Sequence, residues 1–268
     1  ALNGQAPSTA TDMAGGRDTE MAVDQQTAQL LDGLSPPASS EPVAFADIDV
    51  ELAREGARAV WLAYAGPVDD PCNCRDVAIK GASADVPARL YSPADSAEYT
   101  LPLVIFLHGG GWAMGDLDSY DGLMQALCAK SGAHMLSVDT LRPIAWARAV
   151  AADHGFDPTR IAVMGDSAGG NLAAVAARRM HIEHGTRLAA QFLIYPVLDV
   201  SRPHSAYPSR MSYGDGDYLL TRESIDVTLD WYLGADDRPD NPDISPLLAP
   251  DLTCLPPTVI IVGGCDPL

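Results

Sequence analysis

Positive charge is scarce in this sequence of 268 residues. Lysine and arginine together number 17 against 36 acidic residues, and the formal net charge is −19. Lysine itself occurs only at Lys80 and Lys130. A surface of this sign repels nucleic acid and anionic membranes, so we expect no nucleic-acid partner. The acidity indicates solubility or adaptation to a salty medium, with a specific cationic partner as the alternative.

Long hydrophobic runs and metal-binding cysteine patterns are also missing. The longest apolar runs, such as residues 259–262, are too short to cross a bilayer, so no membrane span is expected. Residues 1–20 lack the apolar core of an uncleaved signal peptide and are expected to form a loose tail. The cysteines form neither a zinc-ligand spacing nor a C-x-x-C pair, which predicts free thiols in a reducing, cytoplasmic compartment and no bound metal. They are Cys72, Cys74, Cys128, Cys254 and Cys265.

Alternating helical and strand patterns fill most of the chain. Helical patterns at 21–34 and 48–65, separated by a turn-forming segment at 35–42, precede a strand hairpin at 76–80 and 86–91. Apolar strands then alternate with helices, which predicts an α/β fold with a mostly parallel sheet flanked by helices. The strands are 103–107, 135–138, 161–164, 192–195 and 259–262, and the helices are 123–130, 144–154 and 171–180.

The most informative motif is Gly165-Asp166-Ser167-Ala168-Gly169, which lies between a predicted strand and a predicted helix. In that setting the serine occupies a sharp strand-to-helix turn, and the flanking glycines allow neighbouring backbone to approach closely. The helix N-terminus adds amides and a positive dipole where negative charge would develop. A simple glycine turn is the alternative interpretation, but the strand before and the helix after favour a nucleophile.

A second motif, His108-Gly109-Gly110-Gly111-Trp112, follows the predicted strand 103–107 directly. Three glycines beyond a strand end leave backbone N–H groups able to point into a cleft, as an oxyanion hole requires. A flexible loop is the alternative. Because both motifs follow the C-terminal ends of strands, where the sites of parallel sheets form, each supports the other.

These motifs, together with GDLDSYD at 115–121, YLLTRES at 218–224 and Asp-Pro-Leu at 266–268, resemble the microbial carboxylesterases related to hormone-sensitive lipase. The resemblance runs from about residue 21 onward and implies an α/β-hydrolase fold with a helical lid. On this basis we expect four parts. They are an N-terminal tail with lid helices (1–66), the hydrolase core (67–200), a lid or substrate-wall insertion with one helix at 221–233 (201–250), and the last strand with the triad acid (251–268).

The resemblance also implies a carboxylic ester hydrolase that uses a Ser-His-Asp triad and an acyl-enzyme on short to medium acyl esters, without a cofactor. Ser167 matches the nucleophile and Asp266 the triad acid, while the amides of Gly110, Gly111 and Ala168 match the oxyanion hole. The residues that match supporting positions are His108, Gly109 and Asp166. Candidate pocket walls are Trp112, Tyr213 and Tyr218, for which ordinary aromatic packing is the alternative.

The triad histidine is absent from the expected place. The order Ser, Asp, His puts it after the acid, yet all six histidines precede Asp266. His204 is the least implausible substitute among them, and Asp199 is the rival acid. A stretch that the family carries is also missing after Asp139. We therefore expect this sequence to omit segments of the intact protein, with a natural or engineered deletion as the alternative.

Other functions stay open at this stage. The fold without its base can serve as a small-molecule-binding protein, as in plant hormone receptors that resemble this family. An amidase or an acyltransferase could use the same triad. A homodimer is also left open.

Overall fold

The computed structural model describes residues 23–34, 43–68, 72–80, 85–94, 96, 100–138 and 147–268. The chain divides into two compact units, Ala1–Ser35 and Pro36–Leu268. In the first unit the structure describes helix α1 (Gln25–Leu34), which lies within the helix predicted at 21–34. The predictions for the tail at 1–20, for the turn at 35–42 and for the stretch after Asp139 fall outside the described residues.

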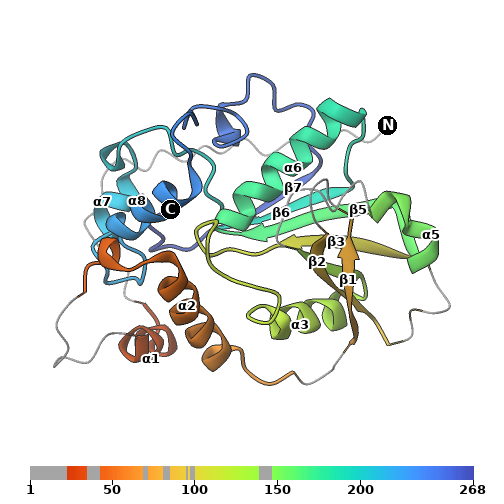
Figure 1. Cartoon of the computed structure of the whole chain (residues 1–268), viewed down its shortest axis with the longest axis horizontal. Coiled ribbons are helices and arrows are strands. Elements are labelled where there is room, and N and C mark those ends of the chain that lie inside the picture. The colour runs from red at the N-terminus through yellow and green to blue at the C-terminus, as the bar shows by residue number, and fades with distance from the viewer. Residues whose placement is uncertain are drawn as a thin grey trace, which may run out of the picture. The chain divides into compact units, whose positions relative to one another are not determined.

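The second unit is built on a sheet of seven strands in the order β1-β2-β4-β3-β5-β6-β7 (Figure 1). β1 pairs antiparallel with β2, and β2 pairs antiparallel with β4, whereas every later pairing is parallel. The predictions of a mostly parallel sheet and of a strand hairpin are therefore confirmed, and the hairpin lies at one edge of the sheet. The strands are β1 (Asn73–Ile79), β2 (Val86–Ser92), β3 (Leu101–Leu107), β4 (His134–Val138), β5 (Phe156–Asp166), β6 (Ala190–Ile194) and β7 (Thr258–Ile261).

Helices cover both faces of this sheet. Figure 1 shows α6 on one side and α3 on the other. Among the described residues of the second unit, the helices with described bounds include α2 (Val50–Tyr64), α3 (Asp121–Ser131), α5 (Ala151–His154), α6 (Ala168–His184), α7 (Pro208–Tyr213) and α8 (Arg222–Tyr232), with 3-10 turns η1 (Phe45–Asp47), η3 (His204–Ala206) and η4 (Pro246–Leu248). No helix in the described ranges is long and apolar enough to cross a membrane.

Local sequence explains where several helices begin and end. Gly132 ends α3 in the left-handed conformation, with φ of 66°, as its position after the predicted helix suggested. Thr221 caps the N-terminus of α8 with a capping box. The Thr221 side chain accepts a hydrogen bond from the amide of Ser224, and the Ser224 side chain accepts one from the amide of Thr221. The helix predicted at 221–233 is thus confirmed to its caps, whereas α7 was not predicted.

The core forms two layers because the side chains of β3 alternate between the faces of the sheet. Leu103, Ile105 and Leu107 pack on the face covered by the alanine-rich side of α6. Phe106 packs on the opposite face with Met124 and Cys128 of α3. The small residues of α6 allow this helix to lie close to the sheet, which holds its N-terminus at the C-terminal end of β5.

The strand predicted at 259–262 is confirmed as β7, although its apolar side chains are exposed. β7 pairs with β6 alone among the described strands, and it occupies the edge of the sheet. Val259 and Ile260 are 46% and 53% exposed, and Val262 just beyond the strand is 68% exposed. A continuous apolar run is typical of a central strand, which has a neighbouring strand on both sides. The sequence of the run does not specify how many neighbours the strand will have, because that depends on the arrangement of the whole sheet.

Candidate active site

Ser167 lies in the sharp turn between β5 and α6. Its backbone has φ of 52° and ψ of −120°, a conformation that side-chain-bearing residues rarely adopt. The turn is held from both sides, because the Ser167 amide donates to the carbonyl of Ile194 (2.9 Å) and the Ser167 carbonyl accepts from the amide of Asn171 (3.1 Å). The strained backbone keeps the serine partly exposed at the end of the sheet, as a nucleophile requires.

The two outer glycines of this motif are needed for close backbone contact. A Cβ atom on Gly169 would lie 2.5 Å from the carbonyl oxygen of His108 and closer still to that of Leu107. A Cβ atom on Gly165 would meet the backbone of Gly169 and would lie 2.7 Å from the carbonyl oxygen of Leu107. The turn therefore packs directly on the end of β3, which brings Ser167 beside the glycine loop.

Gly169→Ala is expected to lower the free energy of unfolding by about 3 kcal/mol, because backbone atoms must move to admit the methyl group. Gly56→Ala is the control, since this α2 glycine has nothing within 4 Å of an added Cβ and φ outside the left-handed region. It should stabilise the protein by up to about 1 kcal/mol. Urea unfolding followed by circular dichroism measures both, and equal midpoints for the two variants would contradict the packing argument.

The glycine loop that follows β3 has an unusual backbone. Gly110, Gly111 and Gly115 have φ of 110°, 59° and 93°, and Trp112 between them has φ of 58°. A Cβ atom on Gly111 would lie 2.5 Å from the Thr228 side chain of α8, so the loop is also enclosed tightly. Left-handed backbone at successive positions turns peptide N–H groups away from the ladder of the sheet.

The predicted oxyanion amides have no acceptor within the described part of the chain. The amides of Gly110 and Gly111 make no hydrogen bond there, and Ala168 is the first residue of α6, whose amide has no partner within the helix. The N-terminus of α6 adds a partial positive charge at the same place. The predicted oxyanion hole requires unpaired backbone donors of this kind.

Asp166 connects the serine turn to the glycine loop. One carboxylate oxygen accepts from the amide of Gly109 (2.8 Å), and the other accepts from the hydroxyl of Tyr120 (3.0 Å). The residue is only 8% exposed, and burial raises the pKa of its carboxyl group. Tyr120 was not predicted as a site residue, and its place in GDLDSYD was the only available signal. Asp166 thus ties residues on both sides of the proposed reaction centre together.

The side chains of the glycine loop pack against the protein. The Nδ1 atom of His108 lies 2.8 Å from the carbonyl oxygen of Gly109, and the His108 ring lies 5.4 Å from the ring of Tyr120. Trp112 stacks on Tyr232 of α8 at 4.7 Å and 10°, and its Nε1 donates to Asn171 (3.3 Å). These contacts give both side chains fixed orientations next to the glycines.

Asp266 lies in the segment after β7 and is partly exposed. Its Oδ1 atom accepts from the amide of Leu268 (2.8 Å), whereas its Oδ2 atom accepts no hydrogen bond from the described residues. Tyr218, a candidate pocket residue, contacts the Cys265 thiol beside it and packs edge-on against Tyr213 at 5.2 Å. The structure thus brings Tyr218, from the insertion at 201–250, beside the residue that precedes the predicted acid.

Tyr195 is a residue at this edge of the sheet that sequence reasoning missed. It follows β6 with φ of 34°, and its amide donates to the carbonyl of Ile261 in β7 (2.6 Å). Burial, together with the nearby carboxylates of Asp166 and Asp266, raises its pKa to about 12. Both acids are therefore close enough to act on one tyrosine hydroxyl.

The rival acid Asp199 is occupied by local contacts. Its Oδ1 atom accepts from the amide (2.9 Å) and the hydroxyl (2.7 Å) of Ser201, and its Oδ2 atom lies 3.5 Å from Nε of Arg202. Its side chain is 8% exposed. This arrangement is typical of a carboxylate that closes a turn.

No histidine in the described ranges hydrogen-bonds to the Ser167 hydroxyl. His134 and His154 lie against Phe156, at the N-terminal end of β5, whereas Ser167 follows its C-terminal end. His181 is about 20 Å along α6 from Ser167, since a helix rises 1.5 Å per residue. The Nε2 atom of His204 lies 3.0 Å from Oδ1 of Asp226.

The chain is similar in sequence to known α/β hydrolases. Residues 104–143 and 139–268 match a protein family described by the α/β-hydrolase fold. The chain is 37% identical to the carboxylic ester hydrolase LipN of Mycobacterium tuberculosis over 83% of its own length and 63% of that protein. It is 35% identical to the carboxylesterase NlhH of the same organism, over 85% of this chain and 75% of that protein.

Solved structures agree with the sequence comparison. A hyperthermophilic esterase from the archaeon Pyrobaculum calidifontis superposes with a TM-score of 0.83 and 30% identity, over 92% of this chain and 82% of that one. An ester hydrolase from the metagenome of Lake Arreo, solved with a bipyridine phosphonate derivative, superposes with a TM-score of 0.82 and 27% identity, over 92% and 82% of the two chains.

The fold and the serine turn define an α/β hydrolase. Within that class, the chain belongs to the family of microbial carboxylesterases that is related to hormone-sensitive lipase, which is a family of serine hydrolases. The predicted fold class and the predicted family are confirmed. The chain spans 63% of the length of LipN and 75% of that of NlhH.

Proposed function

We propose that the intact protein hydrolyses carboxylic esters of short to medium acyl chains through an acyl-enzyme. The observation that carries this proposal is the contact between the strained turn at Ser167 and the glycine loop, because an oxyanion hole needs backbone donors beside the serine that attacks. The named esterase relatives support the same reaction.

In the proposed reaction, Ser167 Oγ attacks the acyl carbonyl carbon. The carbonyl oxygen becomes an oxyanion that receives hydrogen bonds from the amides of Gly110, Gly111 and Ala168. The alcohol leaves with the proton taken from the serine, and water then attacks the acyl-serine ester and releases the carboxylic acid. Each step uses the same donors, because the oxyanion forms at the same position in acylation and deacylation.

A histidine is needed to carry the proton, since a serine hydroxyl is almost wholly protonated at neutral pH. We assign Asp266 as the acid that orients this histidine. The support is that one Asp266 oxygen is unoccupied among the described residues, whereas both oxygens of Asp199 have partners. No histidine of the described residues is assigned as this partner, because none of them hydrogen-bonds to Ser167.

The lid and pocket assignments belong to the same proposal. We assign α2 and the insertion at 201–250 to the cover of the substrate site, with Trp112, Tyr213 and Tyr218 on its walls. The support is that Tyr218 contacts the residue before Asp266 and that Trp112 follows the oxyanion glycines. Aromatic walls suit the apolar acyl part of an ester.

Covalent labelling tests the proposed nucleophile directly. The intact protein treated with an alkyl fluorophosphonate should form one phosphonate ester at Ser167, with loss of fluoride, because the P=O oxygen can occupy the oxyanion hole. Mass spectrometry of the peptides locates the adduct, p-nitrophenyl butyrate should slow its formation, and heat-unfolded protein is the control. Labelling at another serine, or equal labelling of unfolded protein, would contradict the proposal.

A further inference from the structure

One face of α2 runs along the loop that carries the oxyanion glycines. Arg54 Nε donates to the carbonyl of Ala113 (2.7 Å), and the Arg58 guanidinium bonds to Asp116 and to Asp118 (2.8 Å). Trp61 lies 5.6 Å from the ring of Tyr120. The helix residues are separated by four and three positions, a spacing that puts side chains on the same face of a helix.

This loop depends on outside support. Its first part, Gly110 to Gly115, contains the positive-φ residues described above, and among these Trp112 is the non-glycine residue for which this backbone costs free energy. Its own hydrogen bonds are few, and the amides of Ala113 (3.2 Å) and Met114 (2.8 Å) both donate to the one carbonyl of Gly110. Contacts from α2 therefore add to those from α8 and Asp166 that hold the loop in place.

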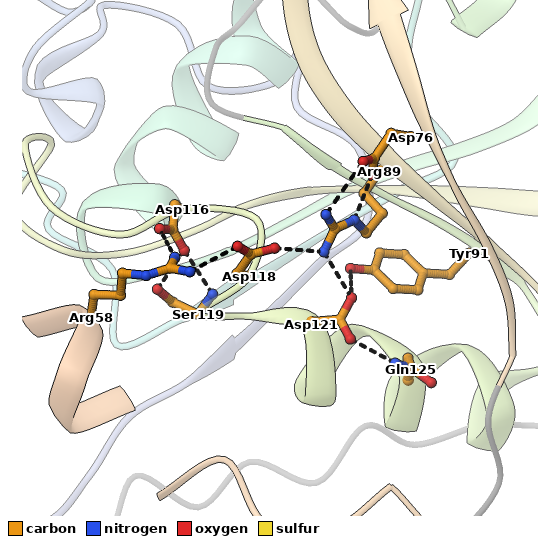
Figure 2. Close-up of polar contacts among 9 residues, drawn as sticks. All are labelled: Arg58, Asp76, Arg89, Tyr91, Asp116, Asp118, Ser119, Asp121 and Gln125. Atoms are coloured by element: carbon orange, nitrogen blue, oxygen red, sulfur yellow. Dashed lines mark hydrogen bonds and ion pairs between the residues drawn. The ribbon is translucent and has the colours of Figure 1, made fainter. Parts of the chain in front are cut away.

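The second part of the loop is fixed by charge. Asp116 accepts from the amide (2.7 Å) and the hydroxyl (2.6 Å) of Ser119, and Asp118 is shared between Arg58 and Arg89 (Figure 2). Arg58 and Arg89 lower the pKa of the Asp118 carboxyl, so it stays ionised at neutral pH. The two arginines thus hold this part of the loop from opposite sides.

Arg89 anchors the network to the sheet. It lies on β2 with a side chain only 18% exposed, and it also bonds to Asp76 (2.6 Å) on β1 and to Asp121 (3.1 Å) at the start of α3. The Tyr91 hydroxyl donates to Asp121 as well (2.8 Å). Figure 2 shows the resulting chain of alternating aspartates and arginines from Asp76 to Arg58.

The network reaches the reaction centre through Tyr120. This residue follows Ser119, packs on Phe106 and His108, and donates to Asp166, which in turn accepts from the amide of Gly109. A shift of the loop at residues 116–119 would therefore move both Tyr120 and the oxyanion glycines relative to Ser167. Misplacement by about 1 Å is enough to lower a catalytic rate up to 100-fold.

We propose that Arg58, through Asp116 and Asp118, is a positioning residue that holds the oxyanion loop in its productive conformation. The inference rests on the proposed ester hydrolysis. Because the side chains of Arg58 and Asp118 are 40% and 50% exposed, this ion pair contributes little to global stability. Its removal should therefore change the chemistry without unfolding the protein.

The test compares Arg58→Met with Arg179→Met in the intact protein. Arg179 is a matched control, since its side chain is 49% exposed and contacts two carboxylates, Glu183 (2.7 Å) and Asp243 (3.9 Å), far from the loop. With p-nitrophenyl butyrate, we expect Arg58→Met to lower kcat about tenfold with KM almost unchanged, and Arg58→Lys to restore part of the loss. Arg179→Met should keep the wild-type kcat, and the Tm of all three variants should stay within about 3 °C.

Each outcome bears on a different claim. An active wild-type protein with an equally active Arg58→Met variant overturns this inference alone, and so does an equal loss of kcat in Arg179→Met. If Arg58→Met does not fold, Asp118→Asn makes the same test, because Arg89 keeps Asp76 and Asp121 as partners. A wild-type protein that neither hydrolyses the ester nor is labelled at Ser167 overturns the proposed function, and the inference with it.

Discussion

Replacing Ser167 by alanine in the intact protein is expected to lower kcat/KM for p-nitrophenyl butyrate by a factor of about 10⁴ to 10⁶. Without the Oγ atom no acyl-enzyme can form, and the remaining catalysis comes from water attacking an ester bound at the oxyanion amides. The stability should change little, because alanine removes one partly exposed hydroxyl that makes no hydrogen bond within the described chain.

The measurement is the rate of p-nitrophenolate release, normalised by protein that is folded according to circular dichroism. Ser131→Ala is the control, since Ser131 is exposed and ends α3 just before the N-terminal end of β4, whereas Ser167 lies at the C-terminal ends of the strands. It should retain the wild-type rate. A Ser167→Ala variant as active as the control would show that the strained turn does not carry the nucleophile.

Asp266→Asn is expected to lower kcat/KM about 10³- to 10⁴-fold, whereas Asp199→Asn should cost less than about tenfold. Asparagine keeps the size of the side chain but loses the charge that orients the histidine and stabilises its protonated form. In Asp199→Asn the oxygen that accepts from Ser201 remains, so only the weak contact with Arg202 is lost.

The two substitutions decide between the candidate acids when both variants are folded. Thermal unfolding provides the check, and both should melt within a few degrees of the wild type, since asparagine keeps the size of the side chain and can keep the hydrogen bonds that Asp199 accepts from Ser201. A large loss of kcat in Asp199→Asn together with an active Asp266→Asn variant would exchange the two assignments. Losses of equal size would leave no special role for Asp266.

Much of the fold could be predicted because its signals are local. The periods of the apolar residues located most strands and helices to within a few positions, and Thr221 and Gly132 marked helix ends through their capping chemistry. The sheet edge is different. Residues 259–262 have the composition of a buried strand, but their exposure depends on what lies beside β7, which no neighbouring residue in the sequence specifies.

The candidate site divides in the same way. The turn at Ser167 and the loop at Gly110 and Gly111 require glycine at fixed positions, because no side chain fits their backbone contacts or their φ angles. Residue type is therefore informative there. The positions of Tyr120 and Tyr195 do not require a particular residue type for their backbone. These tyrosines belong to the site because they lie near Asp166 or Asp266, which are distant in the sequence.

The sequence by itself determined the α/β class, the serine turn, the glycine loop and the family, since each depends on residues that are contiguous or spaced at a regular period. Only the tertiary structure decided that Asp166 ties the two motifs together and that Arg58 of α2 reaches Asp116 and Asp118. The physical reason is that 36 acidic and 17 basic residues allow many pairings of similar energy. The packed sheet selects among them by fixing which side chains meet.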